Sequence, residues 1–375
     1  MTAQSLFEPL RLGAVELAHR VVMAPLTRLR SLQPGDIPHA LNAEYYGQRA
    51  SEGGLIITEA TDISPHARGY PGAPGIYSPE QIAGWQRVTD AVHVKGGIIF
   101  LQIWHTGRVS HSSMQPNNQL PAAPSAVPVT GMSHMDATGA PAEFETPREL
   151  GVEEIGSIVS DFHQAAINAR AAGFDGVEVH GANGYLIDQF LRNGSNHRTD
   201  DYGGSIDNRA RFLFEALDAV ISGWEPGRVG VRLSPWSGFN DMADSDTLAL
   251  FNYAAFELGK RGIAYIHVVE PRADQNSDAN AIDATAPDAA QTFRGAFGGS
   301  VISAGGYVNE TATRAVAEGR ADAIAFGRLF IANPDLPERF GRGATLNRYD
   351  RPTFYGGGAR GYTDYPAMTE EAAEA

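Results

Sequence analysis

The chain has 375 residues and a formal net charge of −15, and it contains no cysteine. Its length fits two or three domains of about 150 residues each, or one large α/β barrel. The negative charge opposes contact with nucleic-acid phosphates and anionic membranes, so we expect neither partner. The absence of cysteine excludes disulfides, iron–sulfur clusters and cysteine nucleophiles. Residues 1–5 lack a signal-peptide pattern, and no apolar run approaches the ~20 residues of a membrane span, which predicts a cytoplasmic protein.

Eight short apolar runs, each ending in glycine, proline or a polar residue, predict buried strands. Helical patterns lie between them and supply the crossovers that parallel strands require. This alternation favours a closed (β/α)8 TIM barrel, with an open doubly wound sheet as the alternative. The predicted strands begin near Val21, Gly54, Gly97, Asp175, Val229, Ala264, Val301 and Ala323, and the clearest helical patterns cover 78–95, 151–172, 205–223, 244–261 and 309–319.

The longest interval between successive strand starts is 78 residues, after the third strand. Residues 110–150 within it are rich in proline, serine, asparagine and methionine and lack helical periodicity, which predicts an excursion that caps a pocket. We expect residues 1–368 to form a single barrel domain with this capping insert. The acidic residues 369–375 are expected to be a disordered tail.

Active sites of such barrels lie at the carboxyl ends of the strands, and several polar residues follow the predicted strands here. Arg232 falls in a run that should be buried, and a buried guanidinium is costly without an anionic ligand or a carboxylate from elsewhere in the chain. Gly305-Gly306 and Gly327-Arg328 combine backbone N–H groups with an arginine, a combination that suits a phosphate.

His180 ends the fourth strand and lies three residues before Asn183. On a helical turn the two side chains would lie about 60° apart and both could donate to one ligand oxygen; alternatively, they satisfy loop backbone. None of the 11 histidines forms an HxH or HExxH pattern, so we predict no metal site. Glu59 and Glu270 could form a glycosidase pair, but a phosphate-bearing organic cofactor is the preferred interpretation.

These residues lie in longer motifs that resemble those of the Old Yellow Enzyme family, the FMN-dependent ene-reductases, and especially its bacterial nitroester and enone reductases. The resemblance runs from about Phe7 to Pro366. Its motifs are RVVMAPLTR at 20–28, QIWHTGR at 102–108, HGANGYLIDQFL at 180–191, NHRTDDYGGS at 196–205, AFGR at 325–328, YGGG at 355–358 and GYTDYP at 361–366.

The resemblance implies noncovalent FMN as the cofactor. Arg328 and the glycine N–H groups would hold its phosphate, Gln102 would bind the pyrimidine edge, Arg232 would lie near N1 and O2, and Thr27 would donate to O4. The implied FMN-binding positions are Pro25, Thr27, Ala60, Gln102, Arg232, Gly305, Gly306, Gly327 and Arg328.

The resemblance also implies a substrate site. His180 and Asn183 would bind the carbonyl or nitro oxygen of an activated alkene, and Tyr185 would supply the proton. Trp104 and Tyr355 would form pocket walls, unless they serve only in packing.

The implied reaction is NADH- or NADPH-dependent reduction of the C=C bond of enones, maleimides and nitroalkenes, with nitrate esters as further acceptors, by a monomer or homodimer. The alternatives are a flavin- or steroid-binding barrel without turnover and a flavin-free barrel lyase or hydrolase.

Overall fold

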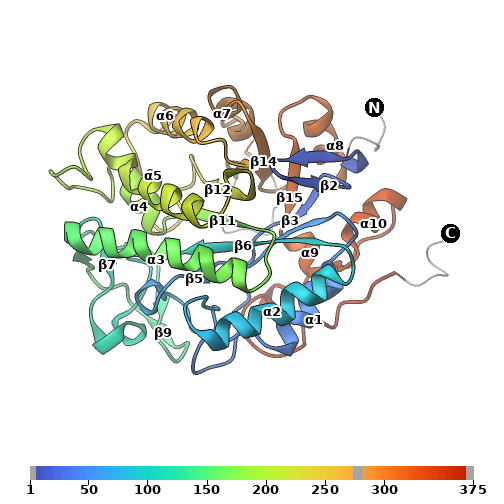
Figure 1. Ribbon diagram of the computed structural model, residues 1–375, viewed down its shortest axis with the longest axis horizontal. Helices are drawn as coiled ribbons and strands as arrows, with labels where there is room; N and C mark the ends of the chain where they lie inside the picture. The colour runs from blue at the N-terminus through green and yellow to red at the C-terminus, as the bar shows by residue number, and fades with distance from the viewer. Residues whose placement is uncertain (1–5, 273–281, 284, 369–375) are drawn as a thin grey trace.

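The computed structural model describes residues 6–272, 282–283 and 285–368, and eight parallel strands form its centre. β6 pairs with β11, and β15 pairs with β3, so the sheet closes into a barrel (Figure 1). All eight predicted strands and the closed barrel are confirmed, whereas the predicted tail at 369–375 lies outside the described residues. The barrel strands are β3 (Val21–Met23), β4 (Leu55–Ile57), β6 (Ile98–Trp104), β11 (Gly176–Gly181), β12 (Val229–Leu233), β13 (Tyr265–Val269), β14 (Ser300–Ala304) and β15 (Ala323–Phe326).

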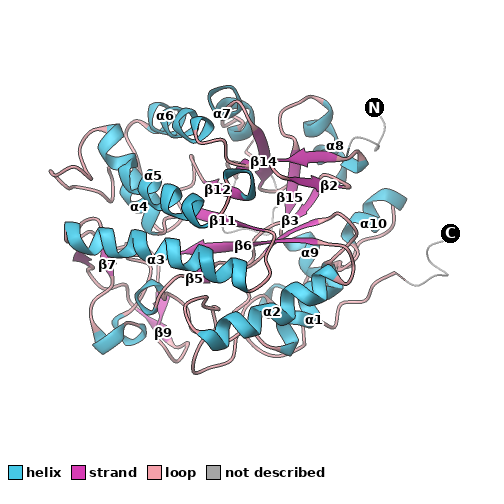
Figure 2. Ribbon diagram, viewed as in Figure 1, coloured by secondary structure: helices cyan, strands magenta, loops and turns pink. Residues whose placement is uncertain are grey.

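Helices surround the strands (Figure 2). On α5, Phe212 and Leu217 face the barrel and are fully buried, whereas Asp218 is exposed. This distribution agrees with the helical period of 3.6 residues, which places apolar residues on one face and charged residues on the other. The predicted fourth helix, α6, begins a turn later than expected because the Asp244 carboxylate instead accepts a hydrogen bond from the Asn193 backbone at 3.0 Å. The helices are α1 (Ala40–Arg49), α2 (Pro79–His93), α3 (Val152–Ala171), α4 (Leu186–Leu191), α5 (Ile206–Gly223), α6 (Thr247–Lys260), α7 (Ala289–Phe297), α8 (Asn309–Ala317), α9 (Arg328–Ala332) and α10 (Leu336–Arg342).

A hairpin closes the amino-terminal end of the barrel. Its strands β1 (Leu10–Leu12) and β2 (Val15–Leu17) are antiparallel. Leu12 and Leu17 are fully buried and belong to one apolar cluster with the barrel residues Phe100 and Tyr265. The hairpin therefore leaves only the carboxyl ends of the strands open to a ligand.

The excursion at 110–150, all of which the structure describes, contains no α-helix, in line with its lack of helical periodicity. It forms two 3-10 turns and the short strands β7 (Ala122–Ala123), β8 (His134–Met135), β9 (Pro141–Ala142) and β10 (Arg148–Glu149). The β8–β9 hairpin reaches the open end of the barrel, where the His134 ring contacts the Tyr70 ring edge-on at 5.0 Å between centroids. Within the described residues, no helix combines the length and apolar character needed to span a bilayer.

Candidate active site

A cavity of about 520 Å³ opens at the carboxyl ends of the barrel strands. Tyr70 and the excursion residue Met135 contribute to its wall, as do Arg351 and Phe354 from beyond the last barrel strand. Most of the predicted site residues line this cavity: Pro25, Thr27, Asn183, Tyr185, Arg232, Gly305, Gly306, Gly327, Arg328 and Tyr355.

One wall of the cavity is made of glycine backbone beside an arginine. Gly305 and Gly306 follow β14 with φ of 127° and 95°, values that favour glycine strongly. A Cβ added to Gly305 would meet the carbonyl oxygen of Glu270 at 3.1 Å. Gly327 follows the neighbouring strand β15 and immediately precedes Arg328, the first residue of α9, so two glycine segments leave backbone accessible to a ligand at the same place.

Four arginines line the cavity: Arg232, Arg272, Arg328 and Arg351. Burial lowers the pKa of Arg272, and the positive charges of the other three lower it further. In a chain of net charge −15, this concentration of positive charge indicates an anionic ligand. Together with the glycine backbone, the arginines fit the phosphate of FMN.

Arg232 has an orphaned polar atom. Its Nε is buried and has no hydrogen-bond partner among the described residues. Burial lowers its pKa, and the nearby Glu178 carboxylate partly offsets this effect. Both oxygens of Glu178 accept hydrogen bonds elsewhere, from Gln102 at 2.7 Å and from His267 at 2.9 Å. Arg232 lines the cavity, and neither Glu178 oxygen satisfies its Nε, which favours the ligand interpretation over a distant carboxylate partner.

Four predicted site residues, Ala60, Gln102, Trp104 and His180, are buried and are not among the residues that line this cavity. Gln102 has its amide nitrogen committed to Glu178, so its carbonyl oxygen is the group left to accept a hydrogen bond. Such an acceptor suits the N–H of a flavin pyrimidine ring.

The turn between His180 and Tyr185 differs from the helical turn that the spacing suggested. β11 continues to Gly181, and both Asn183 and Gly184 have positive φ, at 58° and 75°. The helical-turn expectation was wrong because two consecutive left-handed residues reverse the chain. The reversal nevertheless brings Asn183 into the cavity wall.

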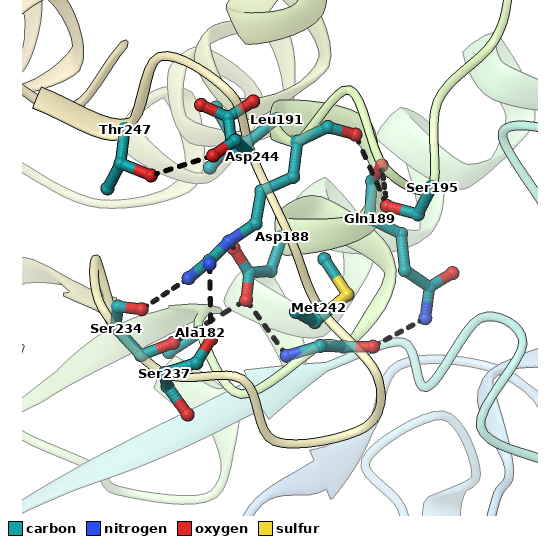
Figure 3. A network of polar contacts seen from close by, with 12 residues as sticks. Ala182, Asp188, Gln189, Leu191, Ser195, Ser234, Ser237, Met242, Asp244 and Thr247 are labelled. Carbon is teal, nitrogen blue, oxygen red and sulfur yellow. Dashed lines mark hydrogen bonds and ion pairs between the residues drawn. The ribbon is translucent and has the colours of Figure 1, made fainter. Parts of the chain in front are cut away.

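Buried side chains hold this turn through its backbone (Figure 3). The Gly184 N–H donates to Asp188 at 2.9 Å, and the Gly184 carbonyl accepts from Gln189 Nε2 at 2.7 Å. The Asn183 N–H donates to Ser234 Oγ at 2.7 Å. Asp188 and Gln189 are both fully buried, so these hydrogen bonds fix the turn from its buried side.

Asp188 also forms a buried ion pair with Arg192, one turn further along the chain, with 2.9 Å between Oδ1 and Nε (Figure 3). The other Arg192 nitrogens donate to the backbone carbonyls of Ser234 and Ser237. The pair therefore ties the 183–185 turn to the loop that follows β12.

His180 is neutral and has a defined tautomer. Its Nδ1 accepts a hydrogen bond from the Ala182 N–H at 3.2 Å, which places the ring proton on Nε2. Burial lowers the pKa of His180 well below its usual value, and the positive charge of Arg232 lowers it further. The His180 ring therefore stays neutral around pH 7, with Nε2–H as its hydrogen-bond donor.

Tyr185 is only 8% exposed, and burial raises its pKa well above 10. Its hydroxyl lies 3.4 Å from that of Tyr70. Trp104 backs Tyr185 with an edge-on contact of 4.5 Å between ring centroids, and its indole N–H donates to Asp62 at 2.7 Å. Trp104 is fully buried, which agrees with the packing alternative rather than with a pocket wall.

A strap at 353–361 carries Tyr355 to the cavity. Arg28 Nε donates to the Phe354 carbonyl at 2.8 Å, and Arg30 Nε donates to the Gly358 carbonyl at 3.0 Å. Both arginines are buried, so residues near the beginning of the barrel hold a segment that follows its last strand. Tyr355 itself is 65% exposed and forms an outer part of the wall.

Several residues that line the cavity were not predicted, among them Tyr70, Arg272 and Arg351. Arg272 lies three residues beyond β13 and could have been found by reading further past the strand end. Tyr70 lies in a bend and Arg351 begins a short 3-10 helix, and neither has a local sequence pattern that marks it.

The glycosidase alternative does not fit this geometry, because Glu59 and Glu270 do not line the main cavity. Each carboxylate instead accepts a hydrogen bond from a backbone N–H: Glu59 from Arg28 at 3.0 Å, and Glu270 from Ala289 at 2.6 Å.

A closed barrel whose open end combines glycine backbone and four arginines with polar side chains such as Asn183 and Tyr185 is the arrangement expected of a flavin-dependent oxidoreductase. Residues 5–347 match the model of the NADH:flavin oxidoreductase / NADH oxidase family. The chain belongs to this family, the group of Old Yellow Enzyme, and its cofactor is FMN with a nicotinamide nucleotide as reductant.

Relatives and solved structures agree over nearly the whole chain. 12-Oxophytodienoate reductase 1 of Oryza sativa subsp. japonica is 50% identical over 367 residues, which are 97% of this chain and 93% of that protein. 12-Oxophytodienoate reductase 2 of Arabidopsis thaliana is 48% identical over 98% of this chain and 96% of its own length. A structure of morphinone reductase in complex with tetrahydroNAD, 49% identical, superposes with a TM-score of 0.90 and covers 98% of each chain.

Proposed function

We propose that this protein reduces the C=C bond of activated alkenes, such as enones, maleimides and nitroalkenes, with NADH or NADPH as the electron source. The observation that carries this proposal is the convergence of Asn183, Tyr185 and Arg232 on the cavity that also holds the glycine and arginine wall. The relatives support the substrate class, because they are named as reductases of 12-oxophytodienoate and morphinone.

Bound FMN supplies the hydride chemistry, and the chain supplies the positions of the groups around it. Arg328 and the backbone of Gly305, Gly306 and Gly327 would hold the phosphate. Thr27 and the Gln102 carbonyl would bind the polar edge of the ring system.

Arg232 would place positive charge beside the flavin, where negative charge develops on reduction. Pro25 and Ala60 would contribute apolar contacts to its ring.

His180 Nε2–H and the Asn183 amide would bind the substrate oxygen and withdraw electrons from the alkene. Both are neutral donors, so they polarise the substrate without needing to change protonation. Tyr185 would donate a proton from its hydroxyl to the alkene carbon, since burial keeps that hydroxyl protonated at neutral pH. The oxygens of nitrate esters suit the same donors, which makes these compounds further candidate acceptors.

We also propose that residues 110–150 act as a cap within a single barrel unit. Met135 of the excursion lines the cavity. Arg108 donates to the carbonyls of Val127 at 3.1 Å and of Asn240 at 3.0 Å, and Asn240 in turn donates to the Asn183 carbonyl at 2.8 Å. The cap is thereby connected to the turn that carries the substrate-binding asparagine.

Anaerobic stopped-flow measurement tests the activity directly. NADH or NADPH should bleach the flavin absorbance of the FMN-loaded protein, and 2-cyclohexenone should restore it in a second step. Flavin that is bleached but not restored by any enone, maleimide or nitroalkene would contradict the proposal and favour a binding barrel without turnover. Protein that stays colourless after incubation with FMN would contradict cofactor binding itself.

A further inference from the structure

Glu178 is a fully buried carboxylate for which the proposed reaction has no use. It lies on β11 two residues before His180, and strand alternation therefore points both side chains to the same side of the sheet. Gln102 Nε2 donates to its Oε1 at 2.7 Å, and His267 Nδ1 donates to its Oε2 at 2.9 Å. Its two partners come from β6 and β13, so Glu178 connects three strands beneath the cavity.

The carboxylate is charged, and His267 does not cancel the charge. Burial opposes ionisation of Glu178, but the interactions with His267, Arg232 and Gln102 outweigh burial and hold its pKa below the usual value. Burial lowers the pKa of His267, which leaves that ring neutral at pH 7. Glu178 is thus the buried negative charge that faces the positive charge of Arg232.

Arg232 and Glu178 are neighbours without a direct bond. Arg232 stands beside His180 on one adjacent strand and beside His267 on the other. Its Nε has no hydrogen-bond partner among the described residues, and the hydrogen bonds of the two Glu178 oxygens go to Gln102 and His267. The carboxylate therefore weakens the positive potential of Arg232 while leaving the guanidinium available to a ligand.

We propose that Glu178 is a positioning residue that sets the reduction potential of the bound FMN. It acts in two ways: it fixes the Gln102 amide with its carbonyl free to accept from the flavin, and it offsets part of the charge of Arg232. Less positive charge beside the flavin stabilises the reduced cofactor less and lowers its potential. This inference rests on the proposed function for the placement of Gln102 and Arg232 beside the flavin.

The test is the midpoint potential of FMN in the holoprotein, measured by equilibration with redox dyes. Glu178→Gln keeps the size of the side chain and removes the charge, so the unopposed Arg232 should favour reduced FMN over oxidised FMN about tenfold more than in the wild type. For a two-electron couple this corresponds to a rise of about 30 mV. An unchanged or lower potential would overturn the proposal, because a purely structural role predicts a loss of thermal stability alone.

Two further variants separate charge from shape. Glu178→Asp retains the charge and should keep the wild-type potential, although a shortened side chain loosens Gln102 and weakens binding of oxidised and reduced FMN equally. Asp62→Asn is the matched control, because Asp62 is also a buried carboxyl, but the groups around it are Asp36, Arg68 and Trp104 rather than Arg232 or Gln102. A shift in either variant as large as that of Glu178→Gln would overturn the proposal.

The measurement also works for a variant that holds FMN weakly. The dissociation constants of oxidised and reduced FMN, measured separately by titration of the apoprotein, give the potential shift through the thermodynamic cycle. Failure of the wild-type protein to bind FMN would instead refute the proposed function.

Discussion

Replacing Gln189 by methionine should destabilise the protein and disturb the turn that carries Asn183 and Tyr185. The Gln189 amide donates to the carbonyls of Gly184 at 2.7 Å and of Thr106 at 3.0 Å, and accepts from the Arg108 N–H at 3.1 Å. Methionine has a similar length but makes none of these bonds. Each buried group left without a partner costs about 1 to 3 kcal/mol, so the free energy of unfolding should fall by at least about 3 kcal/mol.

Urea unfolding of the holoprotein measures this loss, and titration with a phenol measures the effect on the site. A phenol carries an oxygen that can accept from the Asn183 amide as a substrate oxygen would, and its binding should weaken about threefold to tenfold, the equivalent of one hydrogen bond of roughly 0.5 to 1.5 kcal/mol. Gln86→Met is the matched control, since that amide is exposed and donates only to the Ala171 carbonyl at 3.0 Å; its effect should stay within about 0.5 kcal/mol. A loss below about 1 kcal/mol for Gln189→Met, with unchanged phenol affinity, would refute the reasoning.

Three other outcomes are expected at the site itself. Arg328→Ala should weaken FMN retention at least about tenfold, the value of a charge-assisted contact of roughly 1.5 kcal/mol or more; flavin fluorescence measures the release, and unchanged affinity would remove the phosphate assignment. Tyr185→Phe should slow alkene reduction and leave flavin reduction by NAD(P)H nearly unchanged in stopped-flow traces, whereas equal slowing of both steps would argue against a proton donor. Tyr185 loses its proton only above its raised pKa, and His180 gains one only below its lowered pKa. The rate of alkene reduction should therefore be constant between about pH 6 and pH 9. A titration midpoint inside that range would contradict these protonation states.

The barrel could be predicted from sequence because each strand is buried on both faces. A run such as 229–233 is apolar except for Arg232, and its burial is a local property that the sequence displays. Strand ends then indicate where ligand-binding groups gather, which is why most predicted positions line one cavity.

The remaining features depend on contacts between distant segments. Tyr70 meets Tyr185 across 115 positions of the chain, and nothing around it distinguishes it from a tyrosine on the surface. The position of the Asn183 side chain depends on a left-handed backbone turn that Asp188 and Gln189 stabilise. The spacing of three residues between His180 and Asn183 does not reveal that the chain reverses there. Trp104 stands at a strand end like a wall residue, but its bond to Asp62 turns the ring into the packed interior.

The strap at 353–361 has a consequence for how the enzyme is made. The cavity takes Thr27 from the loop after the first barrel strand and Arg351 from just before the strap, and these residues are 324 positions apart in the sequence. At about 5 to 20 residues per second, a ribosome takes roughly 15 to 65 s to pass from one to the other. The complete cavity wall therefore exists only after Arg28 and Arg30 have bound the late-emerging strap, so a ligand that needs the whole wall binds only after the barrel has been synthesised.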